Sequence, residues 1–189
     1  VKCNIDATAK SGTVNGDFGL WLFGGSVGGV FSCNGVRGTS IAYPPNLDNS
    51  KFSDFSPLEK VVFVANGEKG SGESFLDPTS DLRQAVNLLS GGGTVVFCDD
   101  FQLNNTVVLP EYSDTLTLTS RFGGVDFRFA RGASVRMACE LSLGGETEIR
   151  DIHFVTIGEN NIYCNAKKTV IGEGVECTAD LDIVLTPEY

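Results

Sequence analysis

The side chains in this 189-residue sequence that are suited to acid–base chemistry are carboxylates in its second half. Hydrolysis of a glycosidic bond needs two carboxyl groups that converge within roughly 5–10 Å of each other. The candidates are Asp99, Asp100, Asp126, Glu146, Glu148 and Asp151. Because Asp is common at turns and carboxylates are mostly exposed, we interpret this set first as corners and a solvated face. The catalytic residues therefore stay unassigned.

Four arginines form a basic cluster in the sequence, namely Arg121, Arg128, Arg131 and Arg136. On outward positions of neighbouring strands, Arg128 and Arg136 could bind a sugar carboxylate through paired hydrogen bonds. The alternative is a set of weak ion pairs with Glu140, Glu146 or Glu148. His153 is the single histidine, and without a G-x-S-x-G motif it does not indicate a Ser–His–Asp triad. The candidate ligand-binding residues are Arg128, Arg136, Glu146, Glu148 and His153.

The sequence contains six cysteines, Cys3, Cys33, Cys98, Cys139, Cys164 and Cys177. No C-x-x-C pair occurs, so the spacing predicts no structural zinc and we expect no metal or cofactor. Cys98, Cys139 and Cys164 end short apolar runs, which favours small buried thiols there. The even number of cysteines leaves disulfides open.

The chain is acidic, with 14 basic and 24 acidic residues and a formal net charge of −10. It lacks the electrostatic footprint that binds nucleic-acid phosphates or an anionic membrane, so we predict neither partner. No apolar run reaches the roughly 18 residues of a membrane helix, and the first residues do not read as a signal peptide. We expect a fragment or a mature form, with neighbouring domains in a larger chain.

Glycine and aromatic residues dominate the composition, with 23 Gly and 13 Phe. Short apolar runs separated by Gly, Asn and Asp predict many short strands joined at corners. A single helix is predicted at about residues 80–90, where apolar residues recur at helical spacing. Thr79 or Ser80 can cap its start, and Gly91 follows its end.

Three segments follow from these patterns. Residues 1–43 are a glycine-rich segment of short strands that either docks on the rest or precedes it. Residues 44–60 carry three prolines with Asn, Asp and Ser, which is typical of a linker. Residues 61–189 form the main domain, in which residues 61–74 begin with a strand and end in a Gly/Ser loop.

A weak repeat appears in the main domain, with similar apolar runs about 21 to 26 residues apart. The run LSL at residues 141–143 matches IYC at residues 162–164, and FRF at 127–129 matches HFV at 153–155. Aligning RMAC at 136–139 with IYC predicts that Cys164 stacks near Cys139. Strand alternation would place Phe127, Phe129, Ile152 and Phe154 inside and His153 outside.

The stretch DLRQAVNLLSGGGTVVFCDDFQLNNTVVLP, residues 81–110, resembles the N-terminal cap and first turn of right-handed parallel β-helix proteins of the pectate lyase-like superfamily. LSLGGETEIRDIHFV and NNIYCNAKKTVIGEGV are similar to repeats of large secreted surface proteins of gut and other Gram-positive bacteria. GTVNGDFGLWLFGGSVGGVF, residues 12–31, is similar to the glycine-rich turns between such units. The resemblance implies an all-β fold, a right-handed single-stranded parallel β-helix with one N-terminal capping α-helix.

The same resemblance implies a secreted or cell-surface setting. The function expected is a non-catalytic solenoid module that acts as a stalk or adhesin and contacts a polysaccharide, a host glycan or a surface protein. One alternative is a polysaccharide lyase or glycoside hydrolase on the same fold, where Ca²⁺ would serve only the lyase. Another is a trimeric phage tailspike-like fragment. A fold does not fix a function, so no catalytic role is carried over.

Overall fold

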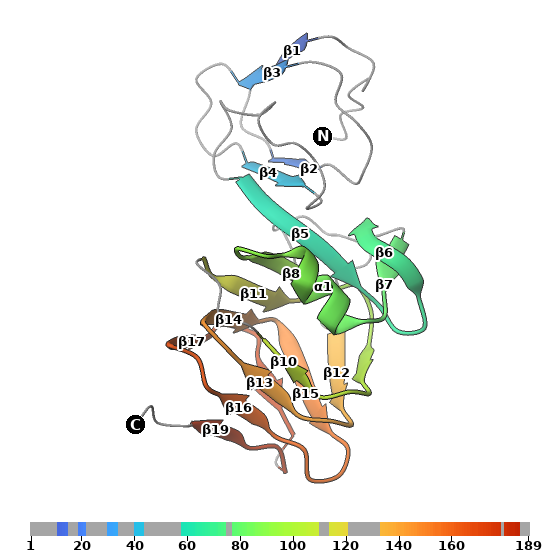
Figure 1. Ribbon diagram of the computed structural model, residues 1–189, viewed down its shortest axis with the longest axis vertical. Coiled ribbons are helices and arrows are strands. Elements are labelled where there is room, and N and C mark those ends of the chain that lie inside the picture. The colour runs from blue at the N-terminus through green and yellow to red at the C-terminus, as the bar shows by residue number, and fades with distance from the viewer. Residues whose placement is uncertain are drawn as a thin grey trace. The chain divides into compact units, whose positions relative to one another are not determined.

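The computed structural model describes residues 11–14, 19–21, 30–33, 40–43, 58–74, 77–109, 114–120, 133–178 and 180–185. The chain divides into two compact units, Val1–Lys60 and Val61–Tyr189 (Figure 1). In the first unit, β1 (Ser11–Val14) pairs in parallel with β3 (Val30–Cys33). In the same unit, β2 (Gly19–Trp21) pairs in parallel with β4 (Ser40–Tyr43), which also pairs with the start of β5 (Leu58–Val64).

Three mostly parallel sheets build the second unit. The first sheet has the order β17-β14-β11-β8-β5 and contains β8 (Gly93–Phe97), β11 (Leu116–Thr119), β14 (Glu146–Arg150) and β17 (Lys168–Ile171). The second sheet contains β9 (Phe101–Leu103), β12 (Ala133–Met137), β15 (Ile152–Thr156) and β18 (Glu176–Cys177). The third sheet contains β10 (Val107–Val108), β13 (Leu141–Leu143), β16 (Ile162–Cys164) and β19 (Ile183–Leu185). From β8 onward the chain adds one strand to each sheet in turn.

The predicted right-handed parallel β-helix is wrong for this structure. The described strands form several separate, mostly parallel sheets that do not close, and a β-helix is not shown. The pattern of apolar runs and corners predicts short strands and neighbours in register, but it does not specify how separate sheets join. The seven-residue β5 and the antiparallel pairing of β6 (Lys69–Ser74) with β7 (Asp77–Thr79) also depart from uniform short coils.

A single helix, α1 (Leu82–Leu88), occurs among the described residues, inside the predicted range of 80–90. Its N-cap is Asp81 instead of Thr79 or Ser80. The Asp81 carboxylate accepts hydrogen bonds from the backbone N–H of Arg83 at 2.9 Å and of Gln84 at 3.3 Å. These bonds satisfy two of the four donors that the start of a helix leaves unpaired, so the helix begins after Asp81.

The predicted Gly/Ser loop in residues 61–74 is in fact strand β6. Its glycines permit close approach, because a Cβ on Gly70 would overlap the backbone carbonyl of Asp77. A Cβ on Gly72 would lie 2.9 Å from Val62 Cγ1. Ser71 then donates from both its backbone N–H and its hydroxyl to Asp77 Oδ2, each at 2.9 Å. Glycine therefore marks tight strand packing here as well as corners.

The structure confirms one predicted register and corrects two others. Leu141 lies opposite Ile162 and Leu143 opposite Cys164, as the LSL and IYC runs predict. Cys164 therefore does not pair with Cys139, which lies between β12 and β13. Ile152 and Phe154 are buried and His153 is half-buried on the outer face, as predicted.

The partners of β15 are β12 and β18, so the expected match with FRF at residues 127–129 is wrong. Phe127 and Phe129 themselves lie outside the described residues.

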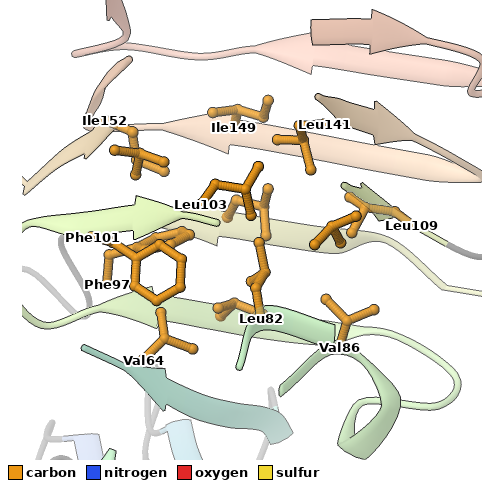
Figure 2. Close-up of a cluster of buried hydrophobic side chains, with 14 of the residues drawn as sticks. Val64, Leu82, Val86, Phe97, Phe101, Leu103, Leu109, Leu141, Ile149 and Ile152 are labelled. Carbon is orange, nitrogen blue, oxygen red and sulfur yellow. The ribbon is translucent and has the colours of Figure 1, made fainter. Parts of the chain in front are cut away.

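The core of the second unit is a continuous stack of apolar side chains from all three sheets and the helix (Figure 2). Inward positions repeat along each sheet, so Val95, Leu118 and Ile149 lie in register on β8, β11 and β14. Phe97 and Phe101 meet edge to face with ring centroids 5.4 Å apart. Val86 belongs to the same cluster and brings helix α1 onto the stack.

Candidate binding site

A cleft of about 370 Å³ opens where three elements meet near the start of α1. Its walls come from the turn between β5 and β6, the segment that leads into α1, and β9 with the corner that follows it. The lining residues are Asn66, Gly67, Ser80, Asp81, Leu82, Arg83, Phe101, Gln102, Leu103, Asn104, Asn105 and Val107. The volume is within the range of small-molecule clefts, roughly 300–1,000 Å³.

Hydrogen bonds between amide groups hold the walls of this cleft. Asn66 Oδ1 accepts from the backbone N–H of Gln102 at 3.2 Å, which ties the β5–β6 turn to β9. Gln102 Nε2 donates to Asn104 Oδ1 at 2.7 Å. Gly67 has a φ of 73°, which favours glycine and lets the turn fold back beside β9. The amide positions are therefore fixed by the fold.

The apolar residues that line the cleft belong to the core. Leu82, Phe101, Leu103 and Val107 are all buried core residues. Because Phe101 is 2% exposed, its ring is not available for stacking on a ligand. The amides of the cleft, with Asp81 and Arg83 among the other lining residues, can hydrogen-bond a neutral polar ligand.

The residues predicted from the sequence lie elsewhere and on two different sheets. Arg136 on β12 and His153 on β15 share the outer face of the second sheet, where Arg136 lies opposite Gln102 and Ser134 opposite His153. Glu146 and Glu148 lie on β14 of the first sheet. The predicted ligand-binding set is therefore not brought together as one group, and Arg128 lies outside the described residues.

Glu148 has a local partner. Its Oε1 lies 4.0 Å from Arg150 Nη1, and both side chains are partly exposed, so the pair contributes little. A small hollow of about 70 Å³ beside Glu146 and Glu148 also includes Lys168. Of the other predicted carboxylates, Asp99 and Asp100 are exposed beside β8, where Asp100 Oδ1 accepts from the backbone N–H of Ser134 at 3.0 Å. Asp126 lies outside the described residues.

The described cysteines differ in burial. Cys164 is buried, Cys98 and Cys139 are half-buried, and Cys177 is exposed; all four are free thiols. Burial, with the charge of Asp99 beside it, raises the pKa of Cys98 to about 12. Burial also raises the pKa of Cys177. The prediction of small buried thiols at the ends of apolar runs is confirmed fully only at Cys164.

No group of three or more His, Cys, Asp or Glu side chains suited to hold a metal ion is found among the described residues. Within the same residues, no helix has the length and apolar character needed to cross a membrane.

The amide residues of the cleft were missed by reasoning from the sequence. Asn66, Asn104 and Asn105 read as ordinary turn residues, because asparagine is common at corners. Gln102 reads as one outward position of a short strand. The available signal was the recurrence of asparagine at two corners, Asn66 at one and Asn104 with Asn105 at the other, but only the packing of β5, β9 and α1 brings them to one cleft.

None of the family models, curated proteins or solved structures compared with this chain matches it. The resemblance to pectate lyase-like proteins and to bacterial surface repeats therefore stays a prediction from sequence.

Proposed function

We propose that this chain is a non-catalytic module of a secreted or cell-surface bacterial protein and that it contacts a neutral glycan through the amide cleft. The observation that carries the glycan contact is the cleft of about 370 Å³ lined by Asn66, Gln102, Asn104 and Asn105. The bacterial and extracellular setting rests on the sequence resemblance alone.

Sugar chemistry fits the amide groups of this cleft. A pyranose presents hydroxyl groups around its ring, and each hydroxyl can donate one hydrogen bond and accept two. Amide side chains offer donors and an acceptor from the same group, so they can match hydroxyls without a charge. The apolar side chains that line the cleft are buried, so the amides are the groups that a sugar would meet.

The charge of the chain favours neutral over acidic sugars. The formal net charge of −10 produces a field that repels polyuronates and other polyanions. Arg83 is the single basic residue among the cleft-lining residues, and the Asp81 carboxylate lies in the same wall. The expected ligand is therefore an oligosaccharide of neutral hexoses or N-acetylhexosamines.

Binding can be measured by amide chemical-shift changes in the full chain titrated with neutral and uronic-acid oligosaccharides. We expect neutral sugars to shift the resonances of Asn66, Gln102 and Asn105 side chains. The double variant Gln102→Ala and Asn105→Ala should weaken binding about tenfold, equivalent to the loss of one or two net hydrogen bonds. Asn87→Ala is the matched control, because Asn87 is exposed on α1 and outside the cleft.

Several results would contradict the proposal. The first is the absence of shifts with every neutral sugar at millimolar concentration. The second is binding that the double variant leaves unchanged. Release of a reducing end or of an unsaturated product from any bound oligosaccharide would contradict the non-catalytic role.

A further inference from the structure

The last strand of each sheet in the second unit exposes side chains that its neighbour buries. Ile149 on β14 is 0% exposed, whereas Ile171, opposite it on β17, is 45% exposed. Ile162 on β16 is 1% exposed, whereas Ile183 on β19 is 37% exposed. Cys164 is 6% exposed and Leu185 is 76% exposed in the same pairing. These residues hold inward positions, so the stack ends in exposed apolar side chains.

The backbone at this end is also available for pairing. The N–H of Lys168 donates to Gly145 O at 3.3 Å, and the N–H of Gly172 donates to Ile149 O at 2.7 Å. Along a parallel strand these bonds alternate between the two sides, so Thr169 and Ile171 direct their N–H and C=O groups away from β14. Among the described strands, β17, β18 and β19 each have one neighbour. We call the edge formed by these three strands the open edge.

We propose that the open edge binds the open edge of a second copy of this chain, so that the edge strands of two copies pair antiparallel around a two-fold axis. Exposed edges with apolar side chains are templates for pairing with another chain. A two-fold contact needs a surface that is complementary to itself. The open edge meets this requirement because apolar residues occur on two of its three strands, β17 and β19.

The charges of the open edge are complementary between its strands. Lys168 lies on β17, while Glu176 lies on β18 and Asp182 immediately precedes β19, and all three are exposed. We place β17 of one copy against β18 or β19 of the other, an arrangement that a two-fold axis allows. A basic strand then meets an acidic one, and the contact occurs twice in the pair of copies. This pairing opposes the general repulsion between two acidic chains.

The opposite ends of the sheets cannot serve as the partner surface in the same way. At that side Asn66 Oδ1 accepts from the backbone N–H of Gln102, on the outer side of β9. Helix α1 contacts β10 and buries Val86 and Leu89 in the core. A head-to-tail array would need these contacts to open, so the geometry favours a closed pair of copies over a filament.

The mass of the full chain in solution, measured by light scattering and sedimentation at about 1–200 µM, tests this proposal. We expect a concentration-dependent pair of copies. Leu185→Lys should weaken it at least tenfold, because a charge then lies within the contact. Val108→Lys is the matched control, since Val108 is also exposed, at 66%, but lies on β10 at the far side of the third sheet. Circular dichroism verifies that both variants fold.

Labelling of Cys177 by a maleimide gives a second measurement without any substitution. Cys177 is exposed on β18, so its labelling rate, read by peptide mass spectrometry, should fall as concentration rises. A mass of one chain at every concentration would overturn the proposal. So would a mass that grows beyond two copies, or a pair of copies that Leu185→Lys and Val108→Lys affect equally.

Discussion

The two ends of the parallel sheets in the second unit have the same kind of sequence but opposite environments. At the end formed by β8, β9 and β10, inward residues such as Val95, Phe101 and Val107 are all buried. At the open edge, inward residues of the same type, Ile171 and Ile183, are exposed. The difference does not come from the residues themselves. It comes from helix α1 and β5 at one end, and from the lack of a described neighbour at the other.

This comparison shows that a strand in a stack of parallel sheets buries its inward side chain only when both adjacent layers are present. Burial of a full Ile or Leu side chain stabilises the fold by about 1.5–3 kcal/mol, and an edge layer obtains only part of this. The open edge therefore contributes less to stability than the covered end and keeps more apolar surface for binding.

Substitution of one isoleucine in each environment gives the largest expected effect. Ile149→Ala should lower the free energy of unfolding by about 2–5 kcal/mol, because it leaves a cavity in a close-packed core. Ile171 lies opposite Ile149 on the neighbouring strand. Ile171→Ala should lower the free energy of unfolding by about 1 kcal/mol or less. Urea unfolding at low micromolar concentration measures both, so that pairing between copies does not mask the result.

Equal costs for these two variants would show that the open edge is covered in the isolated chain. A loss at Ile171 that appears only at high concentration would instead agree with a second copy on the open edge, by the linkage between binding and stability.

The reactivity of two thiols also distinguishes the covered end from the open edge. The pKa of Cys98, on the covered side, is raised to about 12 by burial and by the charge of Asp99. The thiolate is the reactive form, so little Cys98 reacts at pH 8. Partial burial also raises the pKa of Cys177, but its side chain is exposed at the open edge, so it should react with iodoacetamide at least tenfold faster in dilute protein. Mass spectrometry of the labelled peptides measures both rates. Faster labelling of Cys98 would contradict the described packing.

The raised pKa of Cys98 also has a consequence for stability. The folded state holds the thiol proton more tightly than the unfolded chain, so this contribution is complete below about pH 8.5. It is lost progressively as pH rises toward about 12. Cys98→Ser should reduce that alkaline loss.

A feature of the fold or of the cleft could be predicted from the sequence when it depends on residues close together in the chain. The alternation in Ile152, His153 and Phe154 predicts the inner and outer faces of β15, because it follows from one strand. The sequence also predicts the register of LSL (residues 141–143) against IYC (residues 162–164), since both runs have apolar residues at the same spacing. The sequence does not predict that Asn66, Gln102 and Asn105 line one cleft, because this depends on how distant elements pack.

The same reasoning explains the errors in the fold. The Gly70 and Gly72 positions predict a loop when read alone, and only their closeness to Asp77 and Val62 shows that they are strand residues. Whether the sheets close depends on contacts among all the corners. A run of apolar residues does not predict those contacts. A sequence of short strands therefore predicts parallel neighbours more reliably than it predicts the complete architecture.

Removal of the helix cap tests how α1 holds the covered end. Asp81→Ala loses the two hydrogen bonds to Arg83 N and Gln84 N and should reduce stability by about 1 kcal/mol. Asp81→Ser keeps a capping oxygen and is the control that should restore most of the loss. Thermal unfolding followed by circular dichroism measures the difference. If Asp81→Ala and Asp81→Ser are equally stable, the cap does not hold the helix.

The smallest expected effect lies in the antiparallel pair β6–β7, next to the covered end. The backbone N–H and the hydroxyl of Ser71 both donate to Asp77 and hold the pKa of that carboxyl below its ordinary value. Because the folded pKa is the lower one, this contribution is present above about pH 4 and is lost as pH falls through the folded pKa.

Ser71→Ala should bring the pKa of Asp77 back part of the way, since the backbone bond remains, whereas Ser80→Ala should leave it unchanged. Carboxyl resonances followed by NMR between about pH 2 and 6 measure these shifts. A pKa of Asp77 that is the same in the parent and in Ser71→Ala would mean that the hydroxyl does not bind the carboxylate in solution, and that the backbone and glycine packing alone hold β6 against β7.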